Sequence, residues 1–523
     1  MRVFNSSPCH GSRRALIVAN PTTEALACAS TIGKRRSLDL VGFVGDRGFD
    51  IEEFVGGLSV FRGLDQIGDL ARHYAVSEIL LRLGELPSDR AGQVISECRE
   101  SDIRVSLLPG SDQLVSRPPG IKSPGIKSMA TKPTVINPKG IKPGPISGTD
   151  LLRRKPVTLD SEQIHSWLEG RTVMVTGSAG SIGREICSQL LQFRPSRLIA
   201  VDRWEYGQFQ LERELRDLAP NLPVDVCLAD VADAGRMNRL FVEQAPEILV
   251  HAAAYKHVPM METNAGEAIK NNVLATCQLA DLADEFGLQA FVLISTDKAV
   301  NPTSVMGTSK RVVELYTQSL AQTSACRFVT VRFGNVLDST GSAVPIFREQ
   351  IARGGPITVT DPRMTRFFML IPEAAQLVIQ AGAMGRGGEI FVLDMGEPVR
   401  ILDLAYDMIR LAGLRLGHDI DIQFIGLRPG EKLFEELRVH GEIHQPTWHP
   451  NIRGAIRTAP LVAAEIAAGV ERLGDLVDAP SVQIIAELQR IVPEYRPESV
   501  IRGADSRIDD QVANRARSLS RAA

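Results

Sequence analysis

The chain has 523 residues, more than one compact core usually holds, so we expect at least two domains. Its composition is that of an ordinary globular protein, and a net charge of -3 gives no sign of a nucleic-acid partner or an anionic membrane surface. The seven cysteines are scattered, and no signal-peptide core or apolar run of about 18 residues occurs. We therefore expect a soluble, cytoplasmic protein with no integral membrane segment.

The residues from 13 to 109 alternate strand-like and helix-like stretches. ALIVA, LDLVGFVGD, SEILLRL and IRVSLLP are typical of strands, whereas DQIGDLARHY and SDRAGQVISECRES carry helical periodicity. This alternation predicts a small α/β domain with a parallel sheet. Its first turn, VANPTTEA, has no glycine, so the backbone there cannot closely approach a pyrophosphate. We expect a degenerate, Rossmann-like domain with a structural or regulatory role.

Residues 110–150 are rich in Pro, Gly and Lys, and Gly-Ile-Lys recurs three times. Such a segment buries too little apolar surface to offset its chain entropy, so we expect a flexible linker. An alternative is that its lysines contact an acidic partner or a membrane surface.

From residue 171 onward the alternation is stronger. The strands TVMVT, RLIAVD, VDVCLAD, EILVHAAA, AFVLIST and RFVTVRF are separated by helical stretches, which predicts a doubly wound parallel (Rossmann) sheet. Beyond about residue 340 the pattern loosens, as expected for a smaller domain that caps a substrate cleft. We place the catalytic domain at 151–460, divided into a nucleotide-binding portion at about 171–335 and a substrate-binding portion at about 336–460. A helical segment and tail follow at 461–523.

The run TVMVTGSAGSIGREI places three glycines between a strand and a helix. Gly177 allows a tight turn, Gly180 lets the backbone approach a pyrophosphate, and Gly183 lets the helix pack on the strand. Asp202 ends the next strand, where it can accept hydrogen bonds from the hydroxyls of an adenosine ribose. Arg203 could instead hold a 2′-phosphate. We expect NAD as the cofactor, with NADP as the alternative.

Further cofactor contacts are expected at the helix start and after the third and fourth strands. These residues are Ser181, Ile182, Asp230, Val231, Ala252, Ala253 and Ala254. For Asp230 and Val231, the alternative is that a surface acid simply ends a strand.

Three polar side chains follow the strand AFVLIST without interruption. Thr296, Asp297 and Lys298 lie at its carboxyl end, where doubly wound sheets place their ligands. A neighbouring Asp–Lys ion pair without catalytic function is the alternative.

Five segments carry a resemblance to a known family. They are HAAAYKHVPMMETNAGEAIKNNVLAT, ISTDKAVNPTSVMGTSK, VRFGNVLDSTGSAVPIF, MTRFFMLIPEAAQLVIQA and GLRPGEKLFEEL. Across about residues 150–450 the chain resembles the CapD-like polysaccharide-biosynthesis family of extended short-chain dehydrogenase/reductases. The resemblance implies a UDP-N-acetylglucosamine 4,6-dehydratase that oxidises sugar C4, removes water across C5 and C6, and regenerates its cofactor.

The resemblance also implies roles for particular residues. Asp297 would be the acid that assists departure of the C6 hydroxyl, and Lys298 the base at C5, for which its pKa should be lowered. Thr296 would bind the C4 oxygen and Lys310 the nicotinamide ribose. Met306 occupies the place of the superfamily's usual tyrosine, as in long members of the family, and a thioether cannot accept the C4 hydroxyl proton.

Substrate contacts are expected at five positions. Lys256 and His257 follow the fourth strand and should face the cleft. Asn335 resembles the family's diphosphate-binding asparagine. Arg366 and Arg428 are candidates for the phosphates of a UDP-sugar, because guanidinium matches phosphate geometry, with surface salt bridges as the alternative.

The chain departs from the family pattern at three places. Ala179 and Asp338 stand where the family usually has glycine, and a carboxylate at 338 would repel a nearby diphosphate unless it pairs or points away. Long members usually begin with transmembrane helices, which this sequence lacks, so either the lineage became cytosolic or the gene start is misplaced. His440, His444 and His449 have no accompanying cysteine or acid cluster, and we expect no metal site.

Two rival functions stay open. A UDP-hexose 4-epimerase shares the first hydride step but needs no acid and base at C5 and C6. A catalytically silent sugar-nucleotide-binding protein would explain Met306 and Asp338 but not the Thr-Asp-Lys run. The family also leads us to expect a homo-oligomer.

Overall fold

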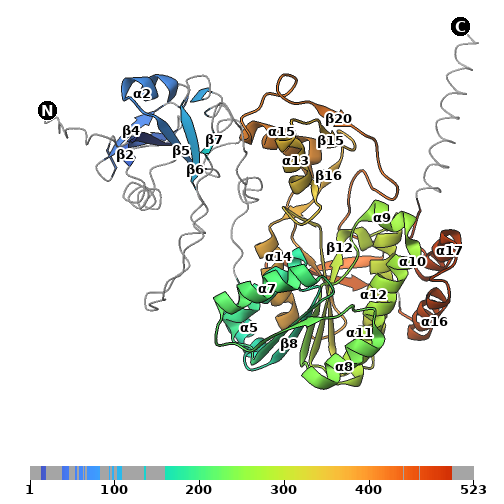
Figure 1. Cartoon of the computed structure of the whole chain (residues 1–523). Coiled ribbons are helices and arrows are strands. Elements are labelled where there is room, and N and C mark those ends of the chain that lie inside the picture. Colours follow the sequence, from blue (N-terminus) through green and yellow to red (C-terminus); the bar gives the residue numbers. More distant parts are fainter. Residues whose placement is uncertain are drawn as a thin grey trace, which may run out of the picture. The chain divides into compact units, whose positions relative to one another are not determined.

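The computed structural model of the chain describes residues 159–497 except 440 and 459, together with short runs between residues 13 and 136. These residues form two compact units, and each is taken by itself below (Figure 1). The first unit comprises Met1–Arg154, Gly341–Val359 and Ile401–Ile425. The second unit comprises Lys155–Thr340, Thr360–Arg400 and Gly426–Ala523.

The first unit contains a seven-stranded sheet in the order β3-β4-β2-β1-β5-β6-β7. Its strands are β1 (Arg13–Val18), β2 (Leu38–Gly45), β3 (Phe54–Val55), β4 (Leu58–Arg62), β5 (Glu78–Arg82), β6 (Arg104–Leu108) and β7 (Val135–Ile136). The inner strands pair in parallel, and the two edge strands pair antiparallel. The predicted α/β architecture of this region is confirmed.

Alternate residues of these strands pack on opposite faces of the sheet. Leu16 and Val18 of β1 pack with Ile67 of helix α2 (Ile67–His73), whereas Ala15 and Ile17 join a separate apolar cluster on the other face. The unit also contains α13 (Ala343–Ala352), β15 (Ile357–Val359), α15 (Ile401–Leu411) and β20 (Ile422–Phe424). The predicted flexible linker at 110–150 lies outside the described residues, apart from Val135 and Ile136.

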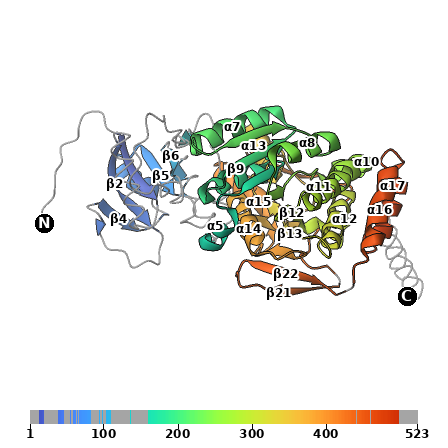
Figure 2. The same cartoon turned by 90° about the horizontal axis from the view of Figure 1, so that it is seen from below.

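The second unit is built on a nine-stranded sheet in the order β10-β9-β8-β11-β12-β13-β18-β22-β21. The strands are β8 (Thr172–Thr176), β9 (Arg197–Asp202), β10 (Val224–Leu228), β11 (Ile248–His251), β12 (Ala290–Thr296), β13 (Arg327–Phe333), β18 (Ile390–Leu393), β21 (Glu442–Pro446) and β22 (Ile452–Arg457). All are parallel from β10 to β18, and the last two form an antiparallel hairpin at one edge (Figure 2). The predicted doubly wound sheet is confirmed.

Helices cover both faces of this sheet (Figure 1). One face packs against α5 (Ser161–Leu168), α6 (Ser181–Leu190), α7 (Glu205–Leu218) and α14 (Ile371–Met384). The other packs against α8 (Ala234–Gln244), the π-helical η4 (Ile269–Leu274), α11 (Ala275–Glu285), α12 (Val305–Leu320), α16 (Ala463–Asp475) and α17 (Ser481–Ile491). Strand periodicity produces this division, since Val173 and Val175 of β8 enter one core and Met174 the other.

Short elements connect the strands of the sheet and the helices on its two faces. They are η3 (Leu191–Phe193), α9 (Val258–Thr263), α10 (Ala265–Ala268), η5 (Asp297–Ala299), β14 (Asn335–Val336), β16 (Thr365–Arg366), β17 (Phe368–Met369) and β19 (Val399–Arg400). Within the described part of the chain, every helix is too short or too polar to cross a membrane.

Candidate active site

The turn between β8 and α6 leaves no room for side chains at two of its three glycines. Gly177 has φ of +69°, and a Cβ there would lie 2.5 Å from the Ala253 nitrogen. A Cβ on Gly183 would lie 2.1 Å from the Gly177 carbonyl oxygen. The turn therefore packs directly on the backbone after β11, and α6 packs directly on the turn, as nucleotide-binding turns require.

Helix α6 begins with free backbone donors. Gly180 is its N-cap residue and provides no side-chain cap for the first N–H groups, which belong to Ser181 and the residues after it. The Ser181 hydroxyl is engaged with Thr340, whereas Ile182 packs against the apolar core. Ten residues long and uncapped by a side chain, this helix presents the kind of positive terminus that binds phosphate groups.

Asp202 ends β9 beside this turn. Its carboxylate accepts hydrogen bonds from the Ala179 N–H at 3.1 Å and from the Trp204 N–H at 2.9 Å. The carboxylate is thus held in place by backbone on both sides. Sequence reasoning identified the position but not these two donors, which depend on how the loops fold together.

Arg203 is already paired with its neighbours. Its guanidinium donates to Asp230 Oδ2 at 3.1 Å and to the Tyr255 hydroxyl, and it lies 4.8 Å from the centre of the Tyr255 ring. Val231, next to Asp230, is buried in the core. The carboxylate of Asp230 therefore offsets much of the positive charge of Arg203 that would be needed to bind a 2′-phosphate.

The Thr-Asp-Lys run forms one hydrogen-bonded group at the carboxyl end of β12. Asp297 is buried, and its Oδ1 accepts from the Thr296 hydroxyl and from Lys298 Nζ, both at 2.9 Å. Lys298 Nζ also donates to Asn335 Oδ1 at 2.8 Å. Asp297 Oδ2 is buried without a hydrogen-bond partner among the described residues. The structure thus brings together four residues that the sequence had nominated.

The ionisation of Lys298 differs from the sequence-based expectation. Burial acts to lower the pKa of Lys298, but the charges of Asp297 and Glu435 outweigh it and hold that pKa above its usual value. Glu435 Oε1 lies 3.7 Å from Nζ, a contact that the sequence analysis missed. The predicted lowering of the pKa is wrong for this arrangement, because two carboxylates face one amine.

Helix α12 packs tightly against this group. A Cβ on Gly307 would lie 2.1 Å from the Lys298 carbonyl oxygen, so the absence of a side chain at 307 lets the helix approach. Met306 is buried within the apolar core at the first turn of α12. One turn later, burial lowers the pKa of Lys310 to about 8, although Glu314 opposes the shift.

Asn272 is a site-supporting residue that the sequence analysis did not identify. It lies in the π-helical η4, and its side chain pairs with the Tyr255 backbone N–H at 2.8 Å and carbonyl at 3.0 Å. Its amide also donates to Ser309 Oγ in α12. The amide therefore ties the loop after β11 to the helix that carries Met306 and Lys310. The widened helical turn was a possible signal, since π-turns concentrate at functional sites.

The remaining residues predicted to bind substrate differ in their exposure and in their hydrogen-bond partners. Lys256 donates to the Thr340 carbonyl at 2.8 Å, and both Lys256 and His257 are exposed. Arg428 is half exposed and pairs with Glu431 at 2.6 Å. Arg366 is buried, and its guanidinium donates to backbone carbonyls rather than standing free for a phosphate. In this structure Arg428 therefore forms the surface salt bridge that was the alternative to phosphate binding.

Asp338 shows why a glycine is usual at that place. Its φ is +63°, the left-handed region that glycine enters without strain and that Asp tolerates better than most residues. The residue also makes an interaction with another part of the protein. The departure from the family pattern is therefore compatible with the backbone.

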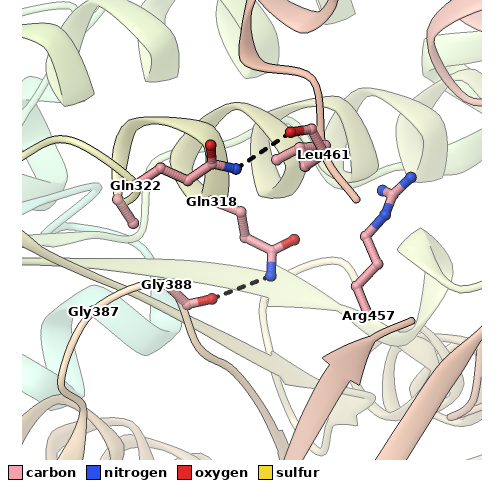
Figure 3. A pocket seen from close by; sticks show the side chains of 7 residues that line it. Gln318, Gln322, Gly387, Gly388, Arg457 and Leu461 are labelled. Atoms are coloured by element: carbon pink, nitrogen blue, oxygen red, sulfur yellow. Dashed lines mark hydrogen bonds between the residues drawn. The ribbon is translucent and has the colours of Figure 1, made fainter. Parts of the chain in front are cut away.

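A separate pocket lies at the other end of α12 (Figure 3). It has a volume of about 280 Å³, and its lining includes Gln318, Gln322, Gly388 and Arg457. Hydrogen bonds from Gln318 to the Gly388 carbonyl and from Gln322 to the Leu461 carbonyl cross it (Figure 3). Gln318 is 12 residues beyond Met306, roughly 18 Å along the helix, so this pocket is distinct from the Thr-Asp-Lys group.

With this geometry in place, comparison with known proteins identifies the family. The sequence profile of the family described as polysaccharide biosynthesis protein matches residues 173–456, more than half of the chain. The chain belongs to this family. The match covers both the nucleotide turn and the Thr-Asp-Lys group.

The relatives of this chain are named for different functions. The probable polysaccharide biosynthesis protein EpsC of Bacillus subtilis is 39% identical over 84% of this chain and 71% of its own length. An inverting UDP-N-acetylglucosamine 4,6-dehydratase of Campylobacter jejuni is 30% identical over 58% of this chain and 89% of its own. A UDP-glucose 4-epimerase of Rickettsia canadensis is 32% identical over 51% of this chain and 77% of its own.

One solved structure confirms the fold of the polysaccharide biosynthesis domain. Pen from Bacillus thuringiensis is 32% identical, with a TM-score of 0.51 over 57% of this chain and 91% of that one. This similarity agrees with the Rossmann-like fold of the second unit, and the named relatives include both a dehydratase and an epimerase of nucleotide sugars.

Proposed function

We propose that this polysaccharide biosynthesis protein catalyses the NAD(P)-dependent 4,6-dehydration of a UDP-N-acetylhexosamine, with UDP-N-acetylglucosamine as the expected substrate. The observation that carries the proposal is the pair of the partly buried Lys298 and the buried Asp297, joined by a 2.9 Å contact. Elimination of water needs an acid and a base side by side, whereas epimerisation at C4 needs neither at C5 and C6.

The chain offers a site that fits the dinucleotide. The two glycines that a Cβ would crowd, the uncapped start of α6 and the fixed carboxylate of Asp202 match the pyrophosphate and ribose of NAD. The pairing of Arg203 with Asp230 favours NAD over NADP. When bound, NAD would take a hydride from sugar C4 as the C4 hydroxyl loses its proton, and would return it to C6 as C5 regains a proton. Lys310 is expected to hold the nicotinamide ribose.

The elimination step is assigned to Asp297 and Lys298. The C5–H bond breaks, its proton passes to Lys298 Nζ, and its electron pair forms the C5–C6 double bond. The C6–O bond breaks at the same time, and the oxygen takes a proton from Asp297 and leaves as water. Thr296 is expected to bind the C4 oxygen, and the Nδ2 donors of Asn335 to bind the diphosphate.

The resting pair needs one proton transfer before it can act. The raised pKa of Lys298 favours its ammonium form, yet elimination requires the neutral amine beside a protonated Asp297. An ammonium beside a carboxylate carries the same number of protons as a neutral amine beside a carboxylic acid. Transfer of one proton from Nζ to Oδ1 across the 2.9 Å contact therefore converts the resting pair into the reactive one.

The test is incubation of the purified full chain with UDP-N-acetylglucosamine and NAD, followed by mass spectrometry and proton NMR. Loss of one water with a new C6 methyl signal is the expected result, and the couplings at C5 would show whether that centre is inverted. A UDP-hexose with C4 inverted and no water lost would instead identify an epimerase. Unchanged sugar from a protein that binds cofactor would identify a silent binding protein.

Lys298→Ala is expected to lower kcat by roughly 10²–10⁴-fold, because general acid–base catalysis contributes about that much. Cofactor binding, followed by fluorescence of NADH, should be retained. Lys270→Ala is the matched control, since Lys270 is an exposed lysine on η4. Turnover by Lys298→Ala at the wild-type rate would contradict the role of Lys298 as the C5 base.

A further inference from the structure

Glu435 is a buried carboxylate beside the reactive pair to which no role has yet been given. Its side chain is only 3% exposed, and Oε1 lies 3.7 Å from Lys298 Nζ and 3.6 Å from Arg366 Nε. Oε2 is buried without a hydrogen-bond partner among the described residues. Buried carboxylate oxygens are rarely left in this state, so the placement needs an explanation.

The segment that carries Glu435 is anchored by the buried Arg366. One guanidinium nitrogen donates to the Lys432 carbonyl at 2.8 Å, and another to the Leu433 carbonyl at 3.3 Å. The Leu433 carbonyl also accepts from the Thr365 N–H at 3.2 Å. These contacts fix residues 432–435 against β16, so the carboxylate is held at Lys298 by a built arrangement and not by a flexible surface loop.

Four groups face the Lys298 amine from separate elements. Asp297 comes from η5, Asn335 from β14, Arg366 from β16 and Glu435 from the segment after residue 426. Asp297 already serves as the general acid in the proposed reaction, and the positive charge of Arg366 repels the ammonium of Lys298. Glu435 is therefore the one remaining anion among these groups that can offset a positive charge on Nζ.

We propose that Glu435 is a positioning residue that holds Lys298 and stabilises the ammonium formed when that amine takes the C5 proton. The buried aspartate of serine-protease triads acts on its histidine in the same way. The inference rests on the proposed dehydration. The proton that moves from C5 to Nζ stays on Nζ, and Glu435 supplies charge without itself gaining or losing a proton.

The proposal predicts the direction of a pH effect. A carboxylate next to a lysine raises the pKa of that lysine, so removing the charge of Glu435 should lower the pKa of Lys298. The reactive pair holds one proton, shared between Lys298 and Asp297, so the rate falls when that proton is lost above the pKa of Lys298. This falling limb of the rate profile should move to lower pH in Glu435→Gln. A purely structural defect would lower the rate at every pH without moving the limb.

The first experiment needs no turnover. The full chain is labelled at graded pH with acetic anhydride in competition with a free amine, and acetylation of Lys298 is measured by mass spectrometry. In Glu435→Gln the midpoint of Lys298 labelling should fall by about one pH unit or more. Glu436→Gln is the matched control, because Glu436 is exposed and pairs with Lys432 instead. It should leave the midpoint unchanged. An unshifted midpoint in Glu435→Gln would overturn the proposal.

A second variant guards against misfolding of the first. Glu435→Asp keeps the charge but withdraws it by one methylene, so its midpoint should lie between those of wild type and Glu435→Gln. If the Gln variant fails to fold, a lowered midpoint in the Asp variant supports the proposal, and a wild-type midpoint contradicts it.

The kinetic experiment separates this proposal from the proposed function. With UDP-N-acetylglucosamine, Glu435→Gln should lower kcat roughly 10- to 100-fold and shift the limb, with less change in KM. A wild-type protein that forms no dehydrated product counts against the dehydratase, while the labelling result still decides on Glu435. Product from wild type with an unmoved limb in the variant overturns the role of Glu435 alone.

Discussion

Gly183 decides how closely α6 can approach the nucleotide turn. A methyl group there would meet the Gly177 carbonyl at 2.1 Å, a contact that only movement of the backbone can relieve. Gly183→Ala should therefore displace the N–H groups that we propose bind the pyrophosphate. We expect the affinity for NADH to fall at least tenfold, equal to about 1.4 kcal/mol, in a fluorescence titration.

Gly235→Ala in α8 is the control for this substitution. The nearest atom to a Cβ at 235 is a flexible arginine nitrogen at 3.6 Å, so the methyl group has room. NADH affinity should be unchanged in this variant. Equal affinities for the two variants would show that the close contact at 183 does not control the cofactor site.

A network of buried charges joins α12, β13 and β21 beneath the candidate site. Arg332 donates to Glu314 at 2.6 Å and to Glu442 at 2.7 Å, and Arg311 bonds both carboxylates. Burial acts to raise the pKa of Glu442, but hydrogen bonds from Arg332 and the charges of both arginines hold it at about 2. These side chains are almost completely buried, so removing either partner of a pair would leave an uncompensated buried charge.

Glu442→Gln should consequently destabilise the protein by about 3–5 kcal/mol, the usual cost of breaking a buried ion pair. Urea unfolding near pH 7 would measure it. Glu243→Gln is the control, since Glu243 is half exposed and 3.9 Å from its partner Arg236, and it should change stability by less than about 0.5 kcal/mol. Similar losses in both variants would mean that the buried network adds nothing beyond a surface pair.

The elements that the sequence predicted well are those with local signals. All six strands predicted after residue 171 are present, because most of them are short apolar runs buried on both faces of the sheet, a signal contained in each segment itself. The β21–β22 hairpin and the two-residue strands were not predicted, since their pairing depends on partners far along the chain. Thr296, Asp297, Lys298 and Asn335 were nominated from motifs, and the structure brings them together.

Glu435 and the direction of the Lys298 pKa could not be predicted in the same way. Both depend on a segment more than a hundred residues away that folds back onto η5. Asn272 was missed for a similar reason, because its role lies in contacts with Tyr255 and Ser309 on other elements. A sequence pattern identifies side chains that could be reactive. The electrostatic environment that sets the pKa of the Lys298 amine depends on tertiary packing.

The second unit as a whole should lose stability in mild acid through His251. This residue is fully buried between Thr176 at 2.7 Å and Thr276 at 2.9 Å, and burial, with the charge of Lys310, lowers its pKa to about 3. The folded protein keeps it neutral, whereas the unfolded chain protonates it below about pH 6.5. Stability is thus complete above about pH 6.5 and falls by up to about 1.4 kcal/mol for each pH unit below it.

Urea unfolding at about pH 7, 6 and 5 would measure this slope. His251→Gln should flatten it, because glutamine can bond both threonines without titrating. His165→Gln, at a partly exposed position in α5, should leave the slope unchanged. An equally steep slope in His251→Gln would assign the acid sensitivity to other groups. The loss of Glu442 pairing belongs to a lower window, between about pH 4.5 and 2.

The residues of the buried ion-pair network are synthesised at different times. Glu442 lies 110 residues after Arg332 and 131 after Arg311, so a ribosome making about 5–20 residues per second delivers it roughly 5 to 20 s after the strand it neutralises. During that interval two arginines destined for the interior share the single carboxylate of Glu314. The charges of Arg311 and Arg332 can therefore be balanced by Glu314 and Glu442 together only once the nascent chain has reached the β21–β22 hairpin.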